Sequence, residues 1–205
     1  MHSKVLSPRA WAVVRRLVSA GHLDGWILAG GTGLALEFGH RLSEDLDFFR
    51  AGAFEPQSLI DDLSGLGLLE VQSQAGGTLH ITLDRIRLSF LRAQAPLLFP
   101  ATPYRGLLIA DSRDIAVMKI VAIGGRGSRK DFVDLFFLLR SGMALETVLA
   151  LVRRRFTGVD FNEYHLLKSL VYFDDAESEP MPRMLRRASW PEIKKTIVAE
   201  VRRLS

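Results

Sequence analysis

The sequence predicts an α+β protein, with a small mixed β-sheet and its helices first and a helical C-terminal part after it. Three observations predict this fold class. Short apolar runs fill the first half of the chain, apolar residues at helical spacing fill the second half, and no long βαβ alternation is present. The 205 residues suffice for one globular domain with a proper core. We divide the chain into an α/β core over 1–110 and a helical part over 111–205, which can also form a single domain.

The first half begins with a helix that Ser7 caps and Pro8 starts. After it we expect a buried strand, a short helix closed by Gly39, a second strand and a helix that begins near its proline. Three further strands follow, separated by turns at 76–77 and 84–85. The expected elements are a helix to about residue 20, a strand over 25–29, a helix over 32–39, a strand over 45–49, a helix over 55–67 and strands over 68–75, 78–83 and 86–91.

The second half has the period of helices. In one of them Phe132, Leu135, Phe136 and Leu139 form a single apolar stripe. The segment 174–182 is acidic and contains prolines, which predicts a loop. We expect helices over 111–125, 128–142, 144–156, 162–173 and 190–204.

Composition and charge limit the function classes. The chain has no cysteine, which excludes disulfides, thiolate metal sites and cysteine nucleophiles. It has no signal-like N-terminus and no apolar run near the roughly 18 residues of a membrane span, so we expect a cytoplasmic protein that binds no membrane. The net charge is +4, with basic clusters at 153–155, 183–187 and 194–203. These clusters suit a polyanion partner, or equally well are solvated helix faces.

Two features between residues 30 and 47 point to chemistry. Gly30, Gly31 and Thr32 lie where a strand passes into a helix, and there backbone N–H groups can bind a phosphate. Asp45 and Asp47 are two apart on a strand, so both project to one side and can hold a hard cation through oxygen ligands. A phosphate cradle beside paired aspartates is what a nucleoside triphosphate with Mg²⁺ requires. A plain turn and an exposed acidic pair remain the structural alternatives.

The spacing of these motifs resembles a known family. Gly-Gly-Thr followed by Arg41-Leu42-Ser43-x-Asp45-Leu46-Asp47-Phe48 is similar to motif I of the polymerase-β-type nucleotidyltransferases. With the segment 111–139 the pattern is closer to the AbiEii/AbiGii toxin-like branch, over about residues 27–140. The resemblance implies phosphate contacts from the glycine turn and Mg²⁺ held by the two aspartates. It also implies catalytic roles for Lys119 and Asp131, and nucleotide contacts from Ser43, Lys130 and Asp134.

The helical residues can also be read without the resemblance. Asp131 and Asp134 are three apart on one helix, so they share a face. The alternative for Asp131 is a first-turn acid favoured by the helix dipole, and for Lys119 it is a surface lysine with a buried stem. The five histidines show no metal-ligand spacing. His40 either touches substrate or is a loop residue.

The sequence departs from the superfamily at one position. These enzymes usually carry a third carboxylate on a neighbouring strand, and the matching residue here is Ser89. Three interpretations follow: a single catalytic metal, a base recruited from Asp131 or Asp134, or nucleotide binding without turnover.

The resemblance implies an Mg²⁺-dependent transfer of a nucleoside monophosphate from an NTP to an acceptor hydroxyl. The acceptor would be RNA, with tRNA as a candidate, and it would lie on the basic helices after residue 150. The protein would be the toxin of a toxin–antitoxin or phage-defence pair, with a cognate antitoxin as partner. Two alternatives remain. One is a nucleotide sensor or scaffold that lacks the third carboxylate, and the other is a nucleic-acid-binding module with structural aspartates.

Overall fold

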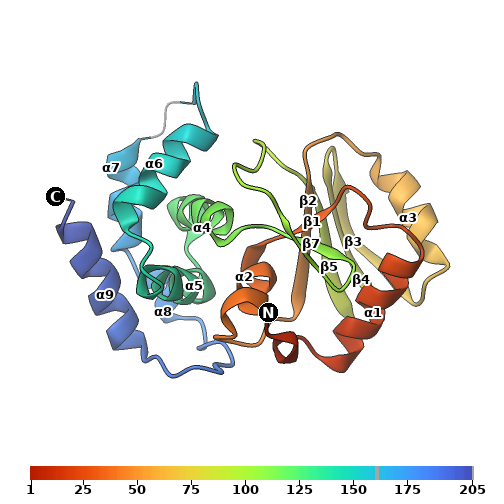
Figure 1. Ribbon diagram of the computed structural model, residues 1–205, viewed down its shortest axis with the longest axis horizontal. Helices are drawn as coiled ribbons and strands as arrows, with labels where there is room; N and C mark the ends of the chain where they lie inside the picture. The colour runs from red at the N-terminus through yellow and green to blue at the C-terminus, as the bar shows by residue number, and fades with distance from the viewer. Residues whose placement is uncertain (160–161, 205) are drawn as a thin grey trace.

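The computed structural model describes residues 1–159 and 162–204, and it has a sheet half and a helical half (Figure 1). In these residues seven strands form one mixed sheet in the order β3-β4-β5-β2-β1-β7-β6. The pairs β1–β7 and β2–β5 are parallel and the other pairs are antiparallel. The strands are β1 (Ile27–Leu28), β2 (Asp45–Arg50), β3 (Leu69–Ala75), β4 (Thr78–Leu83), β5 (Ile86–Arg92), β6 (Thr102–Tyr104) and β7 (Leu107–Ile109).

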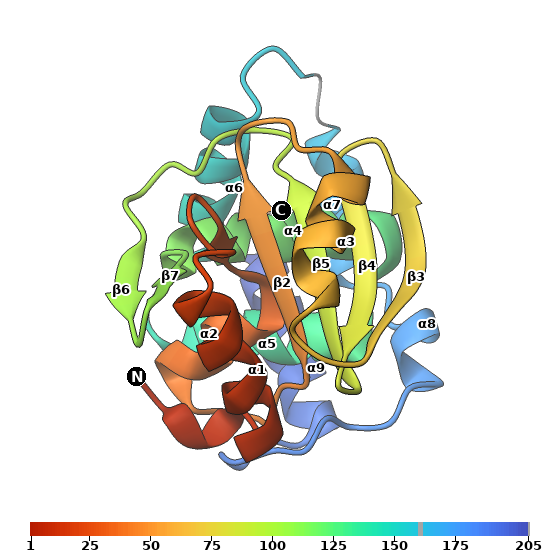
Figure 2. The same ribbon diagram turned by 90° about the vertical axis from the view of Figure 1, so that its right-hand side faces the viewer.

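Helices α1 (Pro8–Ser19) and α3 (Pro56–Ser64) lie in front of the sheet in Figure 2 and cover one of its faces. Alternation along the central strands decides what they cover. Leu46 and Phe48 of β2 and Phe90 of β5 point to this face and are buried to within 1%. The neighbouring residues on each strand therefore point to the opposite face, and this is the face that carries Asp45 and Asp47.

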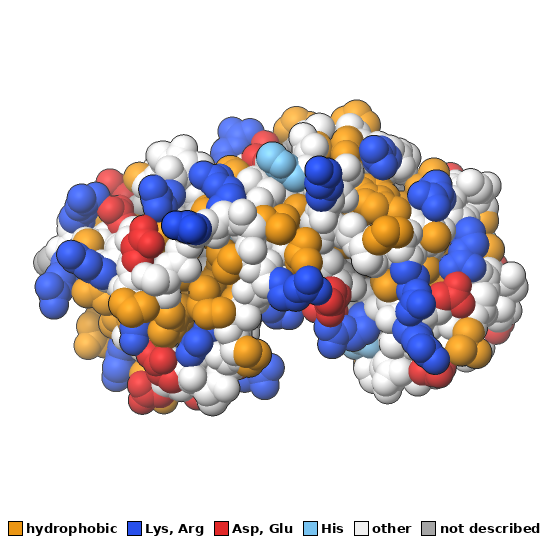
Figure 3. Space-filling model, turned by 90° about the horizontal axis from the view of Figure 1, so that it is seen from below, with side chains coloured by type: hydrophobic (Ala, Val, Ile, Leu, Met, Phe, Trp, Pro, Cys, Tyr) orange, Lys and Arg blue, Asp and Glu red, His pale blue; other side chains and the backbone are white. Residues whose placement is uncertain are grey.

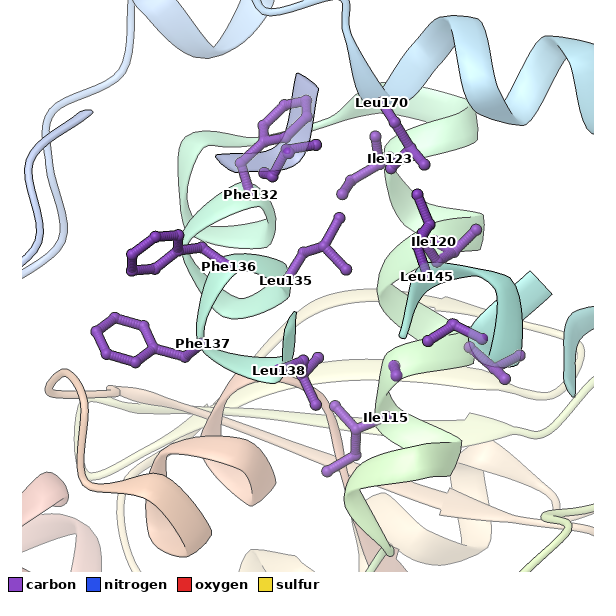
Figure 4. Close-up of a cluster of buried hydrophobic side chains, with 14 of the residues drawn as sticks. Ile115, Ile120, Ile123, Phe132, Leu135, Phe136, Phe137, Leu138, Leu145 and Leu170 are labelled. Atoms are coloured by element: carbon purple, nitrogen blue, oxygen red, sulfur yellow. The ribbon is translucent and has the colours of Figure 1, made fainter. Parts of the chain in front are cut away.

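The helical half is built around α4 (Ser112–Arg126) and α5 (Arg129–Arg140). Leu135 of α5 and Ile123 of α4 point into the space between the two helices (Figure 4). Burying each such side chain contributes about 1.5–3 kcal/mol relative to leaving it exposed. The helices packed around them are α2 (Gly30–Phe38), α6 (Leu145–Arg155), α7 (Glu163–Leu170), α8 (Asp174–Glu177) and α9 (Trp190–Arg202).

Helix α2 joins the two halves. Its Leu34 belongs to the helical core, and its Ala35 and Leu36 belong to the core beneath the sheet. No single helix among the described residues is long and apolar enough to cross a membrane. Helices α5 and α6 reach that length and composition only together, and they are bent by 113°.

The structure confirms the predicted α+β class with a mixed sheet, and it corrects the predicted secondary structure at three places. Helix α2 begins at Gly30, two residues earlier than predicted. The hairpin β6–β7 was not predicted, because its strands have three residues each and Pro103 interrupts the pattern. The predicted loop over 174–182 contains the single-turn helix α8. The Asp84–Arg85 turn is confirmed, since both residues have positive φ angles of 49° and 64°.

Candidate active site

The glycine turn lies at the N-terminus of α2. Strand β1 ends at Leu28, and the first helical hydrogen bond runs from the Gly33 N–H to the Ala29 carbonyl. The amides of residues 30–32 therefore precede that bond and have no acceptor within the helix. Together with the helix dipole, they form a place where an anion can bind. This is the cradle that the sequence predicts.

Two of these glycines are required by close approach. Gly30 has a φ of 59°, and a Cβ there would lie 2.8 Å from Oδ2 of Asp47. At Gly31 a Cβ would lie 2.1 Å from Nη2 of Arg41. The cradle is thus packed directly against one of the two aspartates on one side and against a buried arginine on the other. The two sequence motifs form one site.

Asp45 and Asp47 project from the start of β2 into a shared cavity. The Asp45 carboxylate is ion-paired with Arg87, at 2.6 Å from Nε, and with Lys130, at 3.3 Å from Nζ. Burial raises the pKa of the Asp47 carboxyl, a hydrogen bond from Ser89 opposes this, and the nearby Asp45 charge adds to it. A carboxylate whose charge is disfavoured by burial and by a neighbouring carboxylate, in a cavity open to solvent, forms an attractive site for a cation.

Thr32 and Ser43 tie the cradle to the aspartate strand. The Thr32 hydroxyl contacts Oγ of Ser43 at 2.7 Å and donates to the backbone carbonyl of Asp45. Thr32 is only 1% exposed and Ser43 only 8% exposed. These two hydroxyls therefore fix the loop that leads into β2. The Thr32 hydroxyl is used within the protein, so an anion in the cradle would be bound by the backbone N–H of Thr32.

A second acidic pair lies beneath the cradle. Lys119 of α4 is 2.8 Å from Oδ1 of Asp131 and 2.7 Å from Oδ2 of Asp134, so the two aspartates share a face as predicted. Arg41 donates two hydrogen bonds of 2.7 and 2.8 Å to the carboxylate of Asp134. His40 contacts the same carboxylate through Nε2 at 2.8 Å. Lys119 is 6% exposed, which excludes the surface-lysine alternative.

The charges in this network stabilise one another. Burial by itself would raise the pKa of Asp134, but Lys119 and Arg41 hold that pKa well below its ordinary value. Burial also disfavours a charged Lys119, and the two aspartates outweigh it and raise the pKa of the lysine. His40 responds in the opposite way, because its burial lowers its pKa. The network thus holds two permanent cations against two carboxylates, with a neutral imidazole beside them.

The cradle and the aspartates open into a cavity of about 600 Å³ that also reaches Lys119, Arg126 and Lys130. The extended segment 179–183 forms one of its walls, and a hydrogen bond of 2.8 Å from the Leu42 N–H to the Arg183 carbonyl holds this segment in place. In the view from below, the surface is hollowed between the two halves of the molecule, with basic and acidic side chains on the walls (Figure 3). The volume is of the size that binds a small-molecule ligand.

The donor set fits a hard divalent cation. Asp45 and Asp47 offer carboxylate oxygens in a cavity where phosphate oxygens and water can complete the coordination, as Mg²⁺ prefers. No group of three or more acidic, histidine or cysteine side chains with metal-binding geometry occurs in the described part of the chain. Ser89 lies directly opposite Asp47 in the ladder of β2 and β5, where the sequence placed the missing third carboxylate.

A larger cavity of about 1000 Å³ lies between α1 and the β4–β5 turn, outside this site. Among the described residues that line it, Asp84 is the only carboxylate, and it pairs with Arg16. The other lining residues are apolar or basic, apart from Ser19, so the cavity lacks the paired carboxylates of the aspartate site. We call it the basic groove, and its arginines are Arg9, Arg15, Arg16 and Arg85.

Sequence reasoning missed several residues of the site. Arg41 stood inside the recognised motif, but nothing in the sequence showed that its partner would be Asp134, 93 positions away. The wall over 179–183 was missed for the same reason. His40, which the sequence left as a substrate contact or a loop residue, is buried and contacts Asp134. Asp45, Asp47, Lys119, Lys130 and Asp131 do meet around one cavity, as the sequence predicts.

Comparison with known proteins agrees with this geometry. The family described as "Nucleotidyl transferase AbiEii toxin, Type IV TA system" matches residues 11–69. An uncharacterized protein of Aquifex aeolicus, aq_aa25, is 40% identical over 173 residues, which is 81% of this chain and 82% of that protein.

Two solved structures share the fold. JHP933 from Helicobacter pylori has a TM-score of 0.56 at 17% identity, and the match covers 97% of this chain and 93% of that chain. MenT4, a nucleotidyltransferase toxin from Mycobacterium tuberculosis, has a TM-score of 0.56 at 16% identity, over 95% of this chain and 84% of that chain. The fold is that of the polymerase-β-type nucleotidyltransferases. The chain belongs to the AbiEii nucleotidyltransferase toxin family, and it is a transferase.

Proposed function

We propose that this protein transfers a nucleoside monophosphate from an NTP to a hydroxyl group of RNA, with Mg²⁺ bound by Asp45 and Asp47. The observation that carries the proposal is the contact between the two motifs. A Cβ at Gly30 would lie 2.8 Å from Asp47, so a phosphate on the cradle and a cation on the aspartates would be neighbours. When bound by Asp45 and Asp47, Mg²⁺ would neutralise charge on the phosphates and would make an attacking hydroxyl more acidic.

The protein's own groups position the triphosphate. The amides of residues 30–32 bind its oxygens at the helix N-terminus. Lys119 uses two of its three N–H donors on Asp131 and Asp134, which leaves one for a phosphate oxygen in the cavity that it lines. Lys130 is half exposed beside Asp45 and can reach the departing pyrophosphate. These fixed donors stabilise charge that develops as the bond to the α-phosphorus breaks.

Two basic surfaces can hold an RNA acceptor. On the C-terminal helices, which the sequence favours, Arg153, Lys194 and Arg203 are each ion-paired with an acidic side chain and Arg155 is buried. Among the described residues of these helices, Arg154, Lys195 and Arg202 have no ion pair. In the basic groove, Arg16 is the only arginine with an ion pair among the described residues. Its Arg85 lies two positions before Arg87, which contacts Asp45. We place the RNA backbone in the basic groove, from which the acceptor end can reach the aspartates around the end of the sheet.

The test is a labelling assay with a bacterial RNA pool, MgCl₂ and each NTP in turn, labelled at the α-phosphorus. We expect label to enter RNA with the wild-type protein and not with Asp45→Asn/Asp47→Asn. The Asp61→Asn/Asp62→Asn variant, which changes an exposed acidic pair on α3, is the matched control and should be active. Label at the γ-phosphorus must not enter RNA. Transfer of that label would replace the proposal with phosphoryl transfer.

Ser89 in place of a carboxylate favours a second candidate, a nucleotide-binding sensor or scaffold. It predicts NTP binding in calorimetry that Asp45→Asn/Asp47→Asn weakens, with no label in any RNA. Membership of a toxin family further predicts a cytoplasmic action against the host's own growth. Expression should arrest growth, the double variant should not, and the cognate antitoxin should relieve the arrest by the wild type.

A further inference from the structure

A row of three polar side chains crosses the site face of the sheet. Ser89 of β5 is paired directly with Asp47 of β2 on one side and with His80 of β4 on the other. Nδ1 of His80 lies 3.1 Å from Oγ of Ser89, and Ser89 hydrogen-bonds to the Asp47 carboxylate. The strand pairing therefore forms a continuous hydrogen-bonded row from a histidine to an expected metal ligand.

The row lines a further cavity of about 300 Å³, next to the cavity of about 600 Å³ over the cradle. Both cavities are lined by Asp45, Asp47, Arg87 and Lys130. The aspartate pair thus stands between two spaces, one beside the phosphate cradle and one beside His80. A triphosphate in the first space leaves the second open to an attacking acceptor group.

The hydrogen-bond roles determine which ring nitrogen of His80 carries the proton. An ionised carboxylate only accepts, so Ser89 donates to Asp47, and His80 Nδ1–H then donates to Ser89. This leaves Nε2 of His80 as an acceptor, and it has no partner among the described residues. A base oriented through one ring nitrogen, with the other nitrogen free, is the arrangement that acid–base catalysis uses.

We propose that His80 accepts the proton of the attacking hydroxyl, in the role that a carboxylate at position 89 would otherwise fill. This rests on the proposed nucleotidyl transfer. The acceptor oxygen bonds to the α-phosphorus, the bond from that phosphorus to the bridging oxygen breaks, and pyrophosphate leaves with the electron pair. The hydroxyl proton passes to Nε2 of His80, and the imidazolium releases it to solvent.

The surroundings of His80 allow this role. Two anionic groups on β2, Asp45 and Asp47, and two cationic groups, Arg87 of β5 and Lys130 of α5, line its cavity. Among the described lining residues, strand β3 contributes only the uncharged Gln72. His80 itself is half-buried, so it can reach both substrate and water.

The test combines His80→Gln with Ser89→Asp in the α-label RNA assay described above. Gln can still donate to Ser89, so it removes the base and keeps the row. We expect His80→Gln to lower the rate at saturating NTP by about 10²–10³-fold. Adding Ser89→Asp should then restore at least tenfold, because it supplies the carboxylate. Thr82→Ala, on the same face of β4 and outside the cavity, should stay within threefold of wild type.

A second measurement guards against misfolding. The acidic limb of the rate–pH profile should be present in the wild type and absent from His80→Gln, while the NTP dissociation constant is unchanged. A His80→Gln rate within threefold of wild type, or a loss with an unaltered pH profile that Ser89→Asp does not restore, overturns the inference. If Asp45→Asn/Asp47→Asn is inactive at the same time, nucleotidyl transfer still stands. Absence of labelling by the wild type overturns both proposals.

Discussion

Asp45 and Asp47 lie at the start of the central strand β2, on the face of the sheet that opens into the cavity, whereas Asp131 and Asp134 lie beneath the cradle with all four carboxylate oxygens engaged. The partners of the second pair are Lys119, Arg41, His40 and Ser128. The first pair has partly exposed cations at its rim and an Asp47 whose pKa burial raises. In the second pair the pKa of Asp134 is lowered instead, by buried cations.

The difference separates a site for a ligand from an element of the structure. A carboxylate with a raised pKa gains from an incoming cation, and the protein gives up stability to keep it there. A carboxylate already saturated by buried cations has nothing to offer a metal, and it holds α4, α5 and the loop after α2 together through Lys119 and Arg41. For two acidic pairs of similar spacing, the ion-pair partners of the carboxylates therefore tell a ligand-binding role from a structural one.

We call Asp45 and Asp47 the open pair, and Asp131 and Asp134 the closed pair. The largest expected effect is on catalysis at the open pair. Asp47→Asn should lower the rate of RNA labelling by about 10³-fold, since losing a metal ligand costs several kcal/mol of transition-state stabilisation. The free energy of unfolding should stay the same or rise, because an amide does not resist burial there as a carboxylate does. Both quantities are measured on one preparation, by the labelling assay and by urea titration. A variant that loses stability as well as activity would mean that Asp47, like Asp134, stabilises the fold.

The closed pair should show the reverse. Asp134→Ala leaves Arg41 and Lys119 buried without their partner, and breaking such a buried pair costs about 3–5 kcal/mol. We expect a large fall of the urea midpoint, also with saturating NTP. Asp61→Ala, an exposed carboxylate on α3, should change the midpoint little. An Asp134→Ala protein of normal stability and reduced activity would show that the closed pair acts on substrate.

Gly31 tests the contact between the cradle and the closed pair. A Cβ at this position would lie 2.1 Å from Arg41 Nη2 and 3.3 Å from Asp134 Oδ2. Gly31→Ala should therefore cost about 1–3 kcal/mol of stability and weaken NTP binding in calorimetry. Gly65→Ala is the matched control, since nothing lies within 4 Å of a Cβ there. Equal behaviour of the two variants would mean that the cradle is not built on Arg41.

The sequence predicted the parts of this site that local pattern determines. Alternation along β2 placed Asp45 and Asp47 on one side, and helical spacing placed Asp131 and Asp134 on one face. It could not predict that Lys119 would bridge the second pair, or that Arg41 would reach Asp134 across the fold. Those contacts depend on how α4 and the loop after α2 pack on α5, which no local period encodes. The His80–Ser89 contact depends in the same way on the register between β4 and β5.

The smallest expected effect is a pH dependence of stability that His40 creates in the closed pair. Burial lowers the pKa of His40, so the unfolded chain binds a proton below pH ~6.5 that the folded chain does not. Stability from this source is complete above that pH and falls, by up to about 1.4 kcal/mol per pH unit, as the pH drops toward the folded pKa. Asp47 acts with the opposite sign, because its folded pKa is raised.

The measurement is therefore made in the Asp47→Asn background, by urea titration at pH 7.5 and pH 5.5. The lowered pKa of Asp134 makes its own contribution at more acidic pH, since that is lost only as the pH falls below the ordinary carboxyl range. Adding His40→Gln should remove most of the difference between the two pH values, and adding His22→Gln should leave it in place. A difference that survives His40→Gln would mean that other groups, and not the burial of His40, cause the loss of stability between the two pH values.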